Sequence, residues 1–290
     1  MRGDVMDPFV IAEIGCNHKG DMQIAMEMIR VAALFCKVDA VKFQKRNNRE
    51  LLSADEFDAP HPNPAHSYGE TYGAHREALE LTLPQHRELA DYCRQMGILY
   101  SSSVWDLSSA RDIASLNPAF VKIPSASNLD YRIYSFLCDE YGGEIHVSLG
   151  MTTRKEEEDI AGFLLSKGRL KDTVLYSCVS GYPVAFEDLS LFDITRLKTQ
   201  FGTQVKGIGF SGHHLGIAAD IAAMTLGAGV FERHFTLDRT WKGTDHAASL
   251  EPDGMRKLAR DLRNVSKALT YKRTEILEVE EVQRKKLKRL

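Results

Sequence analysis

Two short segments near the end of the chain place histidines where a buried strand would give way to a loop. They run from Gly209 to Gly216 and from Phe231 to Thr236. A lone histidine on an apolar stretch is more often a core residue, but imidazoles on neighbouring strand ends can share one divalent metal ion. His213 and His234 are therefore the predicted metal ligands. Nitrogen and oxygen ligands leave manganese, magnesium, cobalt and zinc open as the metal.

Two lysines inside apolar runs predict a site for an anion. Lys42 lies in Ala-Val-Lys-Phe and Lys122 in Phe-Val-Lys-Ile, and a buried cation is costly unless it is paired. Either an anionic ligand or a nearby carboxylate, such as Glu13 or Glu232, would offset that cost. Serines at neighbouring strand ends add neutral donors, and the combination favours a pocket for a phosphate and a carboxylate. These serines include Ser102, Ser125, Ser148 and Ser211.

Short β-rich runs alternate with segments of helical periodicity along most of the chain. The helical segments include Met22 to Cys36, Pro84 to Met96, Glu156 to Lys167 and Ile217 to Leu226. Eight such strands predict a closed (β/α)8 barrel, the TIM barrel. The alternative is an open doubly wound sheet, whose Gly-x-Gly-x-x-Gly turn is not found at Gly15 to Gly20. The predicted strands are Phe9 to Ile14, Ala40 to Gln44, Ile98 to Ser102, Phe120 to Ile123, Ile145 to Leu149, Val174 to Cys178, Val205 to Phe210 and Val230 to His234.

Two regions depart from this alternation. The connection from Lys45 to Leu83 is long, and such a loop on the C-terminal face of a barrel shapes a substrate pocket unless it is a flexible insertion. The tail from Tyr271 to Leu290 ends in a charged run, which we expect to be a solvated helix or linker and not a nucleic-acid site. We therefore predict a barrel domain over residues 1–268 and a charged tail over residues 269–290.

The bulk composition argues against several classes of protein. The 290 residues are 43% hydrophobic, which is enough for one large core. The net charge of −3 arises from 37 basic and 40 acidic residues, so we expect no nucleic-acid or membrane-surface partner. No apolar stretch approaches the roughly 20 residues that span a bilayer, and Met1 to Pro8 has no apolar core of a signal peptide. Five scattered cysteines predict reduced thiols in the cytoplasm.

Several longer stretches resemble the sialic acid synthases, which condense phosphoenolpyruvate with a hexosamine-type sugar. The likeness covers most of the predicted barrel, and the stretches are highly specific when taken together. The family usually continues into a small antifreeze-like C-terminal domain, which this sequence lacks. The matching stretches are Ile11 to Gly20, Asp39 to Gln44, Gly207 to His213, Phe231 to Asp238 and Trp241 to Pro252.

The resemblance implies a transferase of the EC 2.5.1 type that depends on a divalent metal, with Mn2+ expected first, and that acts as a homodimer. The substrates would be phosphoenolpyruvate and an aldose, namely N-acetylmannosamine, mannose or one of their 6-phosphates. The product would be a sialic-acid-like 3-deoxy-2-ulosonic acid, with release of phosphate. The implied metal ligands are His213 and His234, and Gln44, Tyr182 and Asp245 match positions that face the metal or the sugar. The implied contacts to phosphoenolpyruvate are Lys42, Ser102, Lys122, Ser125, Ser148 and Ser211.

One residue departs from the family pattern at a position that matters for catalysis. Relatives carry a carboxylate in the turn after the fourth strand, where this chain has Ser127. Serine is not a general base unaided, so Glu13, His18 or a metal-bound water would move the proton. Two alternatives therefore stay open: a synthase of a non-acylated sugar acid of the KDN or Kdo kind, or a catalytically degraded barrel that binds a sugar or an anion.

Overall fold

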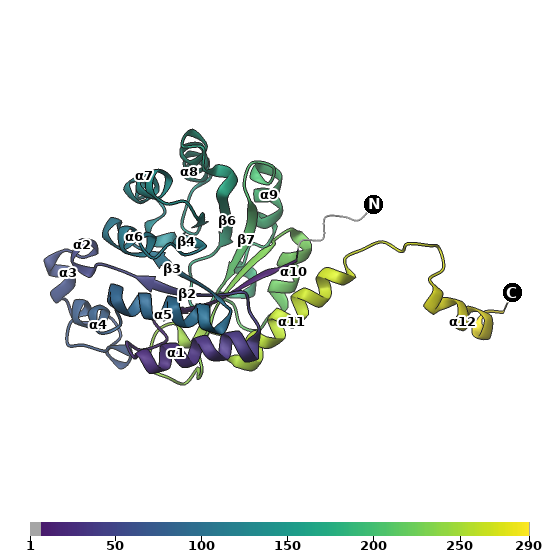
Figure 1. Ribbon diagram of the computed structural model, residues 1–290, viewed down its shortest axis with the longest axis horizontal. Helices are drawn as coiled ribbons and strands as arrows, with labels where there is room; N and C mark the ends of the chain where they lie inside the picture. Colours follow the sequence, from purple (N-terminus) through teal and green to yellow (C-terminus); the bar gives the residue numbers. More distant parts are fainter. Residues whose placement is uncertain (1–6, 290) are drawn as a thin grey trace.

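The computed structural model describes residues 7–289 and contains a closed barrel of eight parallel strands (Figure 1). Each strand pairs with the next in sequence, and β8 pairs with β1, which closes the barrel. The predicted barrel is confirmed, and the open-sheet alternative is wrong. Residues 1–6, which belong to the segment inspected for a signal peptide, lie outside the described residues. The strands are β1 (Phe9–Gly15), β2 (Ala40–Lys45), β3 (Leu99–Val104), β4 (Phe120–Ile123), β5 (Glu144–Ser148), β6 (Thr173–Cys178), β7 (Gly207–Gly212) and β8 (Val230–His234).

The alternation of side chains along each strand separates two environments. In β1, Val10, Ala12 and Ile14 belong to the large apolar core between strands and helices, whereas Ile11 and Glu13 have the opposite parity and face the barrel axis. Inside the barrel, one layer of apolar side chains crosses the axis and consists of Ile11, Ala40, Phe120, Val174 and Tyr176. Polar side chains occupy the axis toward the carboxyl ends of the strands, which is where the candidate site lies.

Helices follow the strands and are delimited by recognisable caps. Asp21 accepts hydrogen bonds from the first turn of α1, and Thr82 with Gln85 forms a reciprocal cap at the start of α5. Gly97 ends α5 with a φ of 69°, a left-handed conformation that favours glycine. The longer helices around the barrel are α1 (Met22–Val31), α5 (Leu83–Met96), α6 (Leu107–Ala114), α7 (Tyr131–Glu140), α8 (Arg154–Ser166), α9 (Phe192–Phe201), α10 (Ala218–Leu226) and α11 (Pro252–Ala268).

Element boundaries differ from the predictions by one or two residues in most cases. β7 begins at Gly207 instead of Val205 because the chain reaches the barrel only after the turn that ends α9. The predicted helix from Met22 to Cys36 is divided: α1 ends at Val31, and Ala32–Cys36 forms a π-helical turn. β3 runs to Val104, two residues beyond the predicted end, and this extension adds Ser103 to the strand.

The long connection between β2 and α5 is structured. It contains α2 (Asn48–Leu51), α3 (Ala54–Asp58), a short 3-10 turn at Pro64–His66 and α4 (Tyr72–Ala78). These elements form one side of the molecule beyond the end of β2 (Figure 1). The connection therefore supplies fixed side chains beside the carboxyl end of the barrel.

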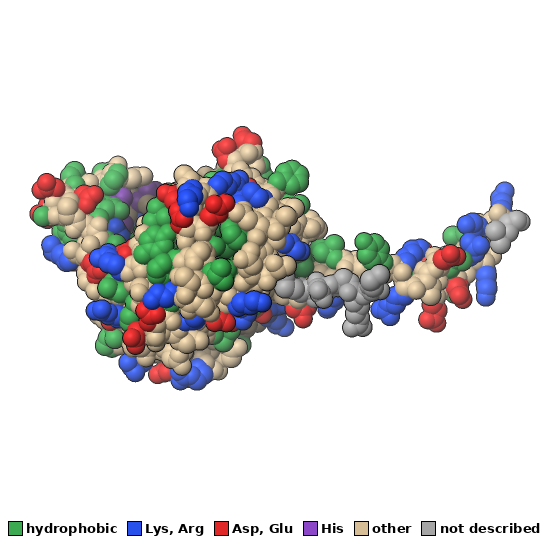
Figure 2. Space-filling view, turned by 90° about the horizontal axis from the view of Figure 1, so that it is seen from above, with side chains coloured by type: hydrophobic (Ala, Val, Ile, Leu, Met, Phe, Trp, Pro, Cys, Tyr) green, Lys and Arg blue, Asp and Glu red, His purple; other side chains and the backbone are tan. Residues whose placement is uncertain are grey.

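The C-terminal residues extend away from the barrel. After α11, the chain continues to α12 (Glu278–Leu287), which has no buried residue. Figure 2 shows acidic and basic side chains along this projecting segment. No helix among residues 7–289 is both long and apolar enough to cross a membrane.

Candidate active site

A cavity of about 270 Å³ lies at the carboxyl ends of the strands. In a barrel enzyme this end carries the chemistry, and side chains from all parts of the barrel converge here. Nine of the eleven predicted site residues line the cavity, whereas Ser102 and Asp245 do not. The lining includes Glu13, Lys42, Gln44, Ser103, Trp105, Lys122, Ser125, Ser148, Cys178, Ser180, Tyr182, Ser211, His213, Glu232 and His234.

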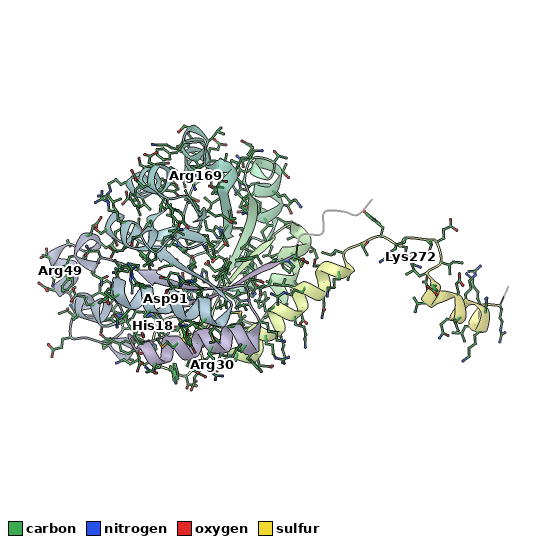
Figure 3. The ribbon with its side chains drawn as sticks, in the orientation of Figure 1. His18, Arg30, Arg49, Asp91, Arg169 and Lys272 are labelled. Atoms are coloured by element: carbon green, nitrogen blue, oxygen red, sulfur yellow. The ribbon has the colours of Figure 1, made fainter. Side chains whose placement is uncertain are left out.

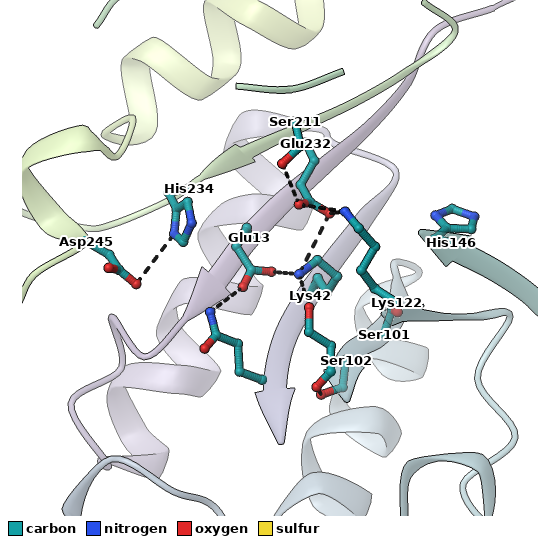
Figure 4. Close-up of polar contacts among 12 residues, drawn as sticks. Glu13, Lys42, Ser101, Ser102, Lys122, His146, Ser211, Glu232, His234 and Asp245 are labelled. Carbon is teal, nitrogen blue, oxygen red and sulfur yellow. Dashed lines mark hydrogen bonds and ion pairs between the residues drawn. The ribbon is translucent and has the colours of Figure 1, made fainter. Parts of the chain in front are cut away.

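Two lysines and two glutamates form a buried network at the base of the cavity (Figure 4). Lys42 Nζ lies 2.5 Å from Glu13 Oε2 and 3.7 Å from Glu232 Oε2. Lys122 Nζ donates to both oxygens of Glu232, at 2.9 and 3.0 Å. The sequence left open whether Lys42 and Lys122 are paired by an anionic ligand or by a nearby carboxylate, and the carboxylates are present. Both lysines still line the cavity, where an anion can approach them.

The network shifts the ionisation of its members. Burial raises the pKa of Glu13 from 4.5 to about 7, and the charge of Glu232 adds to the rise despite the opposing Lys42. Burial alone would raise the pKa of Glu232, but Lys122 and Lys42 outweigh it and hold that pKa well below its usual range. Burial also lowers the pKa of Lys122, while the two carboxylates keep that of Lys42 raised. Glu13 is thus the member that can exchange a proton near neutral pH.

The two predicted metal ligands lie side by side at the cavity wall. The ring centroids of His213 and His234 are 5.4 Å apart, and the Tyr182 ring lies 4.3 Å from that of His213. The Nδ1 atom of His213 is 2.9 Å from the carbonyl oxygen of Val179, which can only accept, so Nδ1 carries the hydrogen. The Nδ1 atom of His234 is buried, has no hydrogen-bond partner among residues 7–289, and lies 3.9 Å from Asp245 Oδ2.

Burial and the neighbouring charges act differently on these two imidazoles. Burial lowers the pKa of His234 to about 4, so its ring is neutral at pH 7 as a metal ligand must be. Burial would also lower the pKa of His213, but its interaction with the Cys178 thiol outweighs this and raises it. Among residues 7–289, no group of three or more histidine, cysteine, aspartate or glutamate side chains is arranged around a common metal position.

The serines illustrate how strand parity decides which hydroxyl reaches the cavity. Ser125, Ser148 and Ser211 line it, and Ser211 donates to Glu232 Oε1 at 2.9 Å. Ser102 does not line it, because its side chain has the outward parity and its hydroxyl donates to the backbone oxygen of Ser103. Ser103 takes the inward position and accepts a hydrogen bond from Lys42 Nζ at 2.5 Å.

The remaining predicted residues surround the histidines. Gln44 lines the cavity and its amide donates to Glu13 Oε1 at 3.0 Å. Tyr182 lines it from the loop after β6. Asp245 does not line the cavity, and its carboxylate faces the His234 ring (Figure 4). Ser127 is 7% exposed and its hydroxyl donates to the Trp105 carbonyl, so it is outside the cavity lining.

Sequence reasoning missed Trp105 as a lining residue. It directly follows β3, and its backbone N–H donates to the Lys45 carbonyl, which extends the pairing of β3 with β2 by one residue. An aromatic residue two positions after the inward-facing Ser103 is the signal that could have identified it, once the end of β3 was placed correctly.

The chain is similar to known proteins over most of its length. Residues 28–274 match the model of the NeuB family. The chain is 37% identical to N-acetylneuraminate-9-phosphate synthase of Homo sapiens over 261 residues, which cover 90% of this chain and 71% of the relative. It is 34% identical to N,N'-diacetyllegionaminic acid synthase of Campylobacter jejuni, over 90% of this chain and 77% of that relative.

A solved structure extends the likeness to three dimensions. The N-acetylneuraminic acid synthetase of Leptospira borgpetersenii, solved in complex with citrate, superposes with a TM-score of 0.81 at 27% identity. The superposition covers 100% of this chain and 95% of that one. A family model over most of the chain, together with curated relatives above 30% identity, leaves one assignment: this chain belongs to the NeuB family, the family of the sialic acid synthases.

Proposed function

We propose that this enzyme condenses phosphoenolpyruvate with an aldose to give a 3-deoxy-2-ulosonic acid and inorganic phosphate. The observation that carries the proposal is the single cavity in which Lys42, Lys122 and three serines lie beside His213 and His234. Its relatives are named as synthases of N-acetylneuraminate 9-phosphate, N,N'-diacetyllegionaminic acid and pseudaminic acid. The anion-binding groups and the histidine pair match the needs of the two substrates of such a synthase.

The lysines and serines hold phosphoenolpyruvate in this proposal. Its phosphate and carboxylate accept hydrogen bonds from Lys42, Lys122 and the hydroxyls of Ser125, Ser148 and Ser211. Charge-assisted hydrogen bonds of this kind are stronger than neutral ones. Because the groups are already fixed by Glu13 and Glu232, little reorganisation is needed when charge develops in the transition state.

The reaction forms one carbon–carbon bond and breaks one bond to the phosphate. The C3 carbon of phosphoenolpyruvate attacks the aldehyde carbon, and the aldehyde oxygen takes up a proton. Water adds at C2, and phosphate leaves from the resulting tetrahedral centre, so one water is consumed for each phosphate released. Glu13, whose pKa burial raises to about 7, is the group in the cavity suited to move a proton at neutral pH. Glu13 thus serves as the general acid or base in place of the carboxylate that relatives carry at the position of Ser127.

The histidine pair fits a divalent metal, with Mn2+ proposed ahead of Mg2+, Co2+ and Zn2+. The fit rests on the neutral His234 ring, on its Nδ1 atom, which has no hydrogen-bond partner within residues 7–289, and on the neighbouring His213 ring. Two protein ligands leave other positions of the metal open to substrate and water. When bound, the metal supplies Lewis-acid polarisation of the aldehyde. Gln44, Tyr182 and Asp245 would orient the sugar beside it.

The experiment that tests the function measures phosphate release and product mass. The protein is incubated with phosphoenolpyruvate, Mn2+ and a panel of aldoses that contains N-acetylmannosamine, mannose, pentoses and their phosphates. We expect at least one aldose to give stoichiometric phosphate and a product heavier than that aldose by the mass of pyruvate. Binding of phosphoenolpyruvate without turnover on any aldose would instead support a degraded, ligand-binding barrel.

We further propose a cytoplasmic homodimer. All five cysteines are unpaired, as in a reducing compartment. Met151, which lines the cavity, and Phe186 and Phe192, which follow β6, are large apolar side chains that are 68%, 57% and 81% exposed. Large apolar side chains that gather on a surface are typical of a site that binds protein. Size-exclusion chromatography with light scattering measures the mass, and a monomer at micromolar concentration would contradict the dimer.

A further inference from the structure

The two histidines of the cavity wall are held in place by different means. β8 pairs with β1 up to the level of His234, which lies opposite Glu13. The pairing of β7 with its two neighbours, β6 and β8, ends before His213. His213 therefore lies beyond the last paired position of its strand, and residues 213–217 belong to no helix or strand. The backbone of this loop needs other contacts to fix the His213 ring.

Arg233 supplies such contacts from the neighbouring strand. It lies in β8 between two residues that line the cavity, and its own side chain has the opposite parity, so it points away from the barrel axis. Its Nη2 atom donates to the carbonyl oxygen of His214 at 2.5 Å, and its Nη1 atom donates to that of Gly216 at 2.8 Å. One side chain thus binds two carbonyl groups in the loop that directly follows His213.

The guanidinium is itself fixed by a carboxylate from the helix after the loop. Asp220, in the first turn of α10, accepts a hydrogen bond from Arg233 Nη1 at 2.5 Å. The Nε2 atom of His214 lies 3.1 Å from the same nitrogen. All three side chains are excluded from water, and a buried ion pair of this kind depends on fixed geometry and on additional hydrogen bonds. Arg233, His214 and Asp220 therefore form one buried network that joins β8, the loop and α10.

This network lies beside the cavity but does not line it. Glu232 and His234, the direct neighbours of Arg233 in the chain, line the cavity, whereas Arg233, His214 and Asp220 do not. Contacts behind the ligands of a metal orient those ligands, and their loss typically weakens metal binding about 10- to 100-fold. The network therefore acts on the cavity through the backbone that carries the histidines.

Building on the proposed function and its metal site, we propose that Arg233 is a positioning residue that sets the separation between the His213 and His234 rings. β8 carries both His234 and the guanidinium, and the guanidinium holds the loop that begins at His213. Both rings, whose centroids are 5.4 Å apart, are thereby fixed relative to one strand. Ligands held at a fixed separation lose less conformational freedom on binding than ligands on a mobile loop.

The test separates the binding of metal from the binding of phosphoenolpyruvate. Arg233→Lys keeps a positive charge beside Asp220, but one ammonium group does not reproduce a planar fork that reaches two carbonyl groups. We expect calorimetry to show Mn2+ binding about 10- to 100-fold weaker than in the wild type. The affinity for phosphoenolpyruvate, measured without metal, should stay unchanged, because Lys42 and Lys122 are held by their own carboxylates.

A second variant removes the guanidinium together with its carboxylate partner. Arg233→Met/Asp220→Leu leaves no unpaired charge in the buried network, so it should fold even if Arg233→Met alone does not. It should bind Mn2+ at least as weakly as Arg233→Lys does. The Val184 N–H donates to the His213 carbonyl at 3.1 Å, so hydrogen exchange at Val184 reports on the His213 backbone. That amide should exchange faster in both variants than in the wild type.

A matched control binds carbonyl groups in the same way at the amino end of the barrel. Arg169, which precedes β6, donates to the carbonyl oxygens of Tyr141 and Gly143, each at 2.6 Å (Figure 3). Its acidic partner is Asp172, at 3.2 Å. Arg169→Lys disturbs a comparable set of contacts and should lower the stability of the fold. It should leave both the Mn2+ affinity and the exchange rate at Val184 unchanged.

Two outcomes would overturn the role of Arg233. One is an Arg233→Lys protein with the Mn2+ affinity of the wild type. The other is an equal loss of affinity for Mn2+ and phosphoenolpyruvate in both variants, which would indicate a general disturbance of the barrel. If the wild type itself binds no Mn2+, the proposed metal site fails. In that case faster exchange at Val184 in the variants supports the positioning of His213 by Arg233, and unchanged exchange contradicts it.

Discussion

The Nζ atom of Lys42 lies 2.5 Å from Glu13 Oε2, and both side chains are almost fully excluded from solvent. An ion pair with no access to water gains its stability from geometry and from further hydrogen bonds. Here Ser103 accepts from Lys42 and Gln44 donates to Glu13. The pair is thereby fixed at the base of the cavity with one carboxylate whose pKa lies near neutrality.

We predict that Glu13→Gln lowers kcat by about 10²- to 10⁴-fold, the usual contribution of a general acid or base. The amide keeps the shape and the hydrogen bond to Lys42 but cannot exchange a proton at neutral pH. Steady-state phosphate release measures kcat, and circular dichroism confirms that the variant is folded. Glu27→Gln, on the exposed face of α1, is the control and should behave as the wild type. A Glu13→Gln enzyme within tenfold of wild-type kcat would remove Glu13 from the proton path.

The buried pair of Lys122 and Glu232 predicts that a second substitution can restore stability without restoring activity. Lys122→Met leaves the Glu232 carboxylate with one ammonium fewer in a buried site, and we expect a loss of about 3–5 kcal/mol in the free energy of unfolding. The double variant Lys122→Met/Glu232→Leu should recover much of that loss. Neither variant should turn over phosphoenolpyruvate at a measurable rate. Urea unfolding measures the stability.

An exposed pair offers the comparison. Lys167 Nζ lies 2.9 Å from Asp139 Oδ2 at the surface, and Lys167→Met should cost at most about 1 kcal/mol. If Lys122→Met lowers the free energy of unfolding by no more than Lys167→Met does, the buried network does not contribute to stability in the way its geometry indicates.

The histidine pair predicts loss of metal together with loss of activity. His213→Ala and His234→Ala should each bind Mn2+ at least tenfold more weakly than the wild type and show no turnover, because each removes one of two ligands. Metal content after dialysis and calorimetric titration with Mn2+ are the measurements. Treatment with EDTA should abolish wild-type activity, and added Mn2+ should restore it in the wild type alone. Unchanged metal affinity in both variants would show that the metal ligands lie elsewhere.

Buried histidines outside the metal pair predict a loss of stability in mild acid. Burial lowers the pKa of His18 and His146 to about 4 and that of His86 to about 3. Between pH 4 and 6.5 the unfolded chain therefore binds more protons than the folded one, and stability falls as the pH decreases. His75, whose pKa burial also lowers to about 4, acts in the same direction. Glu13 and Glu157, whose pKa burial raises to about 7, act in the opposite direction between about pH 4.5 and 7. Two carboxyl groups thus oppose four histidines, so the net slope remains positive.

Thermal unfolding measured between pH 5 and 7.5 tests this slope. His86→Phe removes one proton-binding group from the unfolded chain, and each pKa unit of difference is worth about 1.4 kcal/mol. The variant should lose stability at pH 7.5, because Tyr100 loses its partner, but should show a smaller change between pH 7.5 and 5. If the wild type and His86→Phe lose the same amount of stability between pH 7.5 and 5, His86 is protonated in the folded state.

Much of the fold and the site could be predicted because strand-end positions in a barrel share one location. The alternation of short apolar runs with amphipathic segments was sufficient for eight parallel strands, and the barrel then brought Lys42, Lys122, His213 and His234 to one end. The boundaries were less certain, because local periodicity does not show where a strand leaves the sheet. Ser102 was expected in the site from the family likeness, but strand parity turns its side chain outward and gives the inward position to Ser103.

The sequence by itself determined the residue types, their order on successive strands and the family likeness, since these depend on local pattern alone. Only the tertiary structure decided that Lys42 and Lys122 each face a carboxylate, and that Ser127 is turned toward a backbone carbonyl. Each of these relationships joins residues far apart in the chain or depends on the parity of a strand. Spacing along one segment cannot reveal which buried charge has found a partner and which has not.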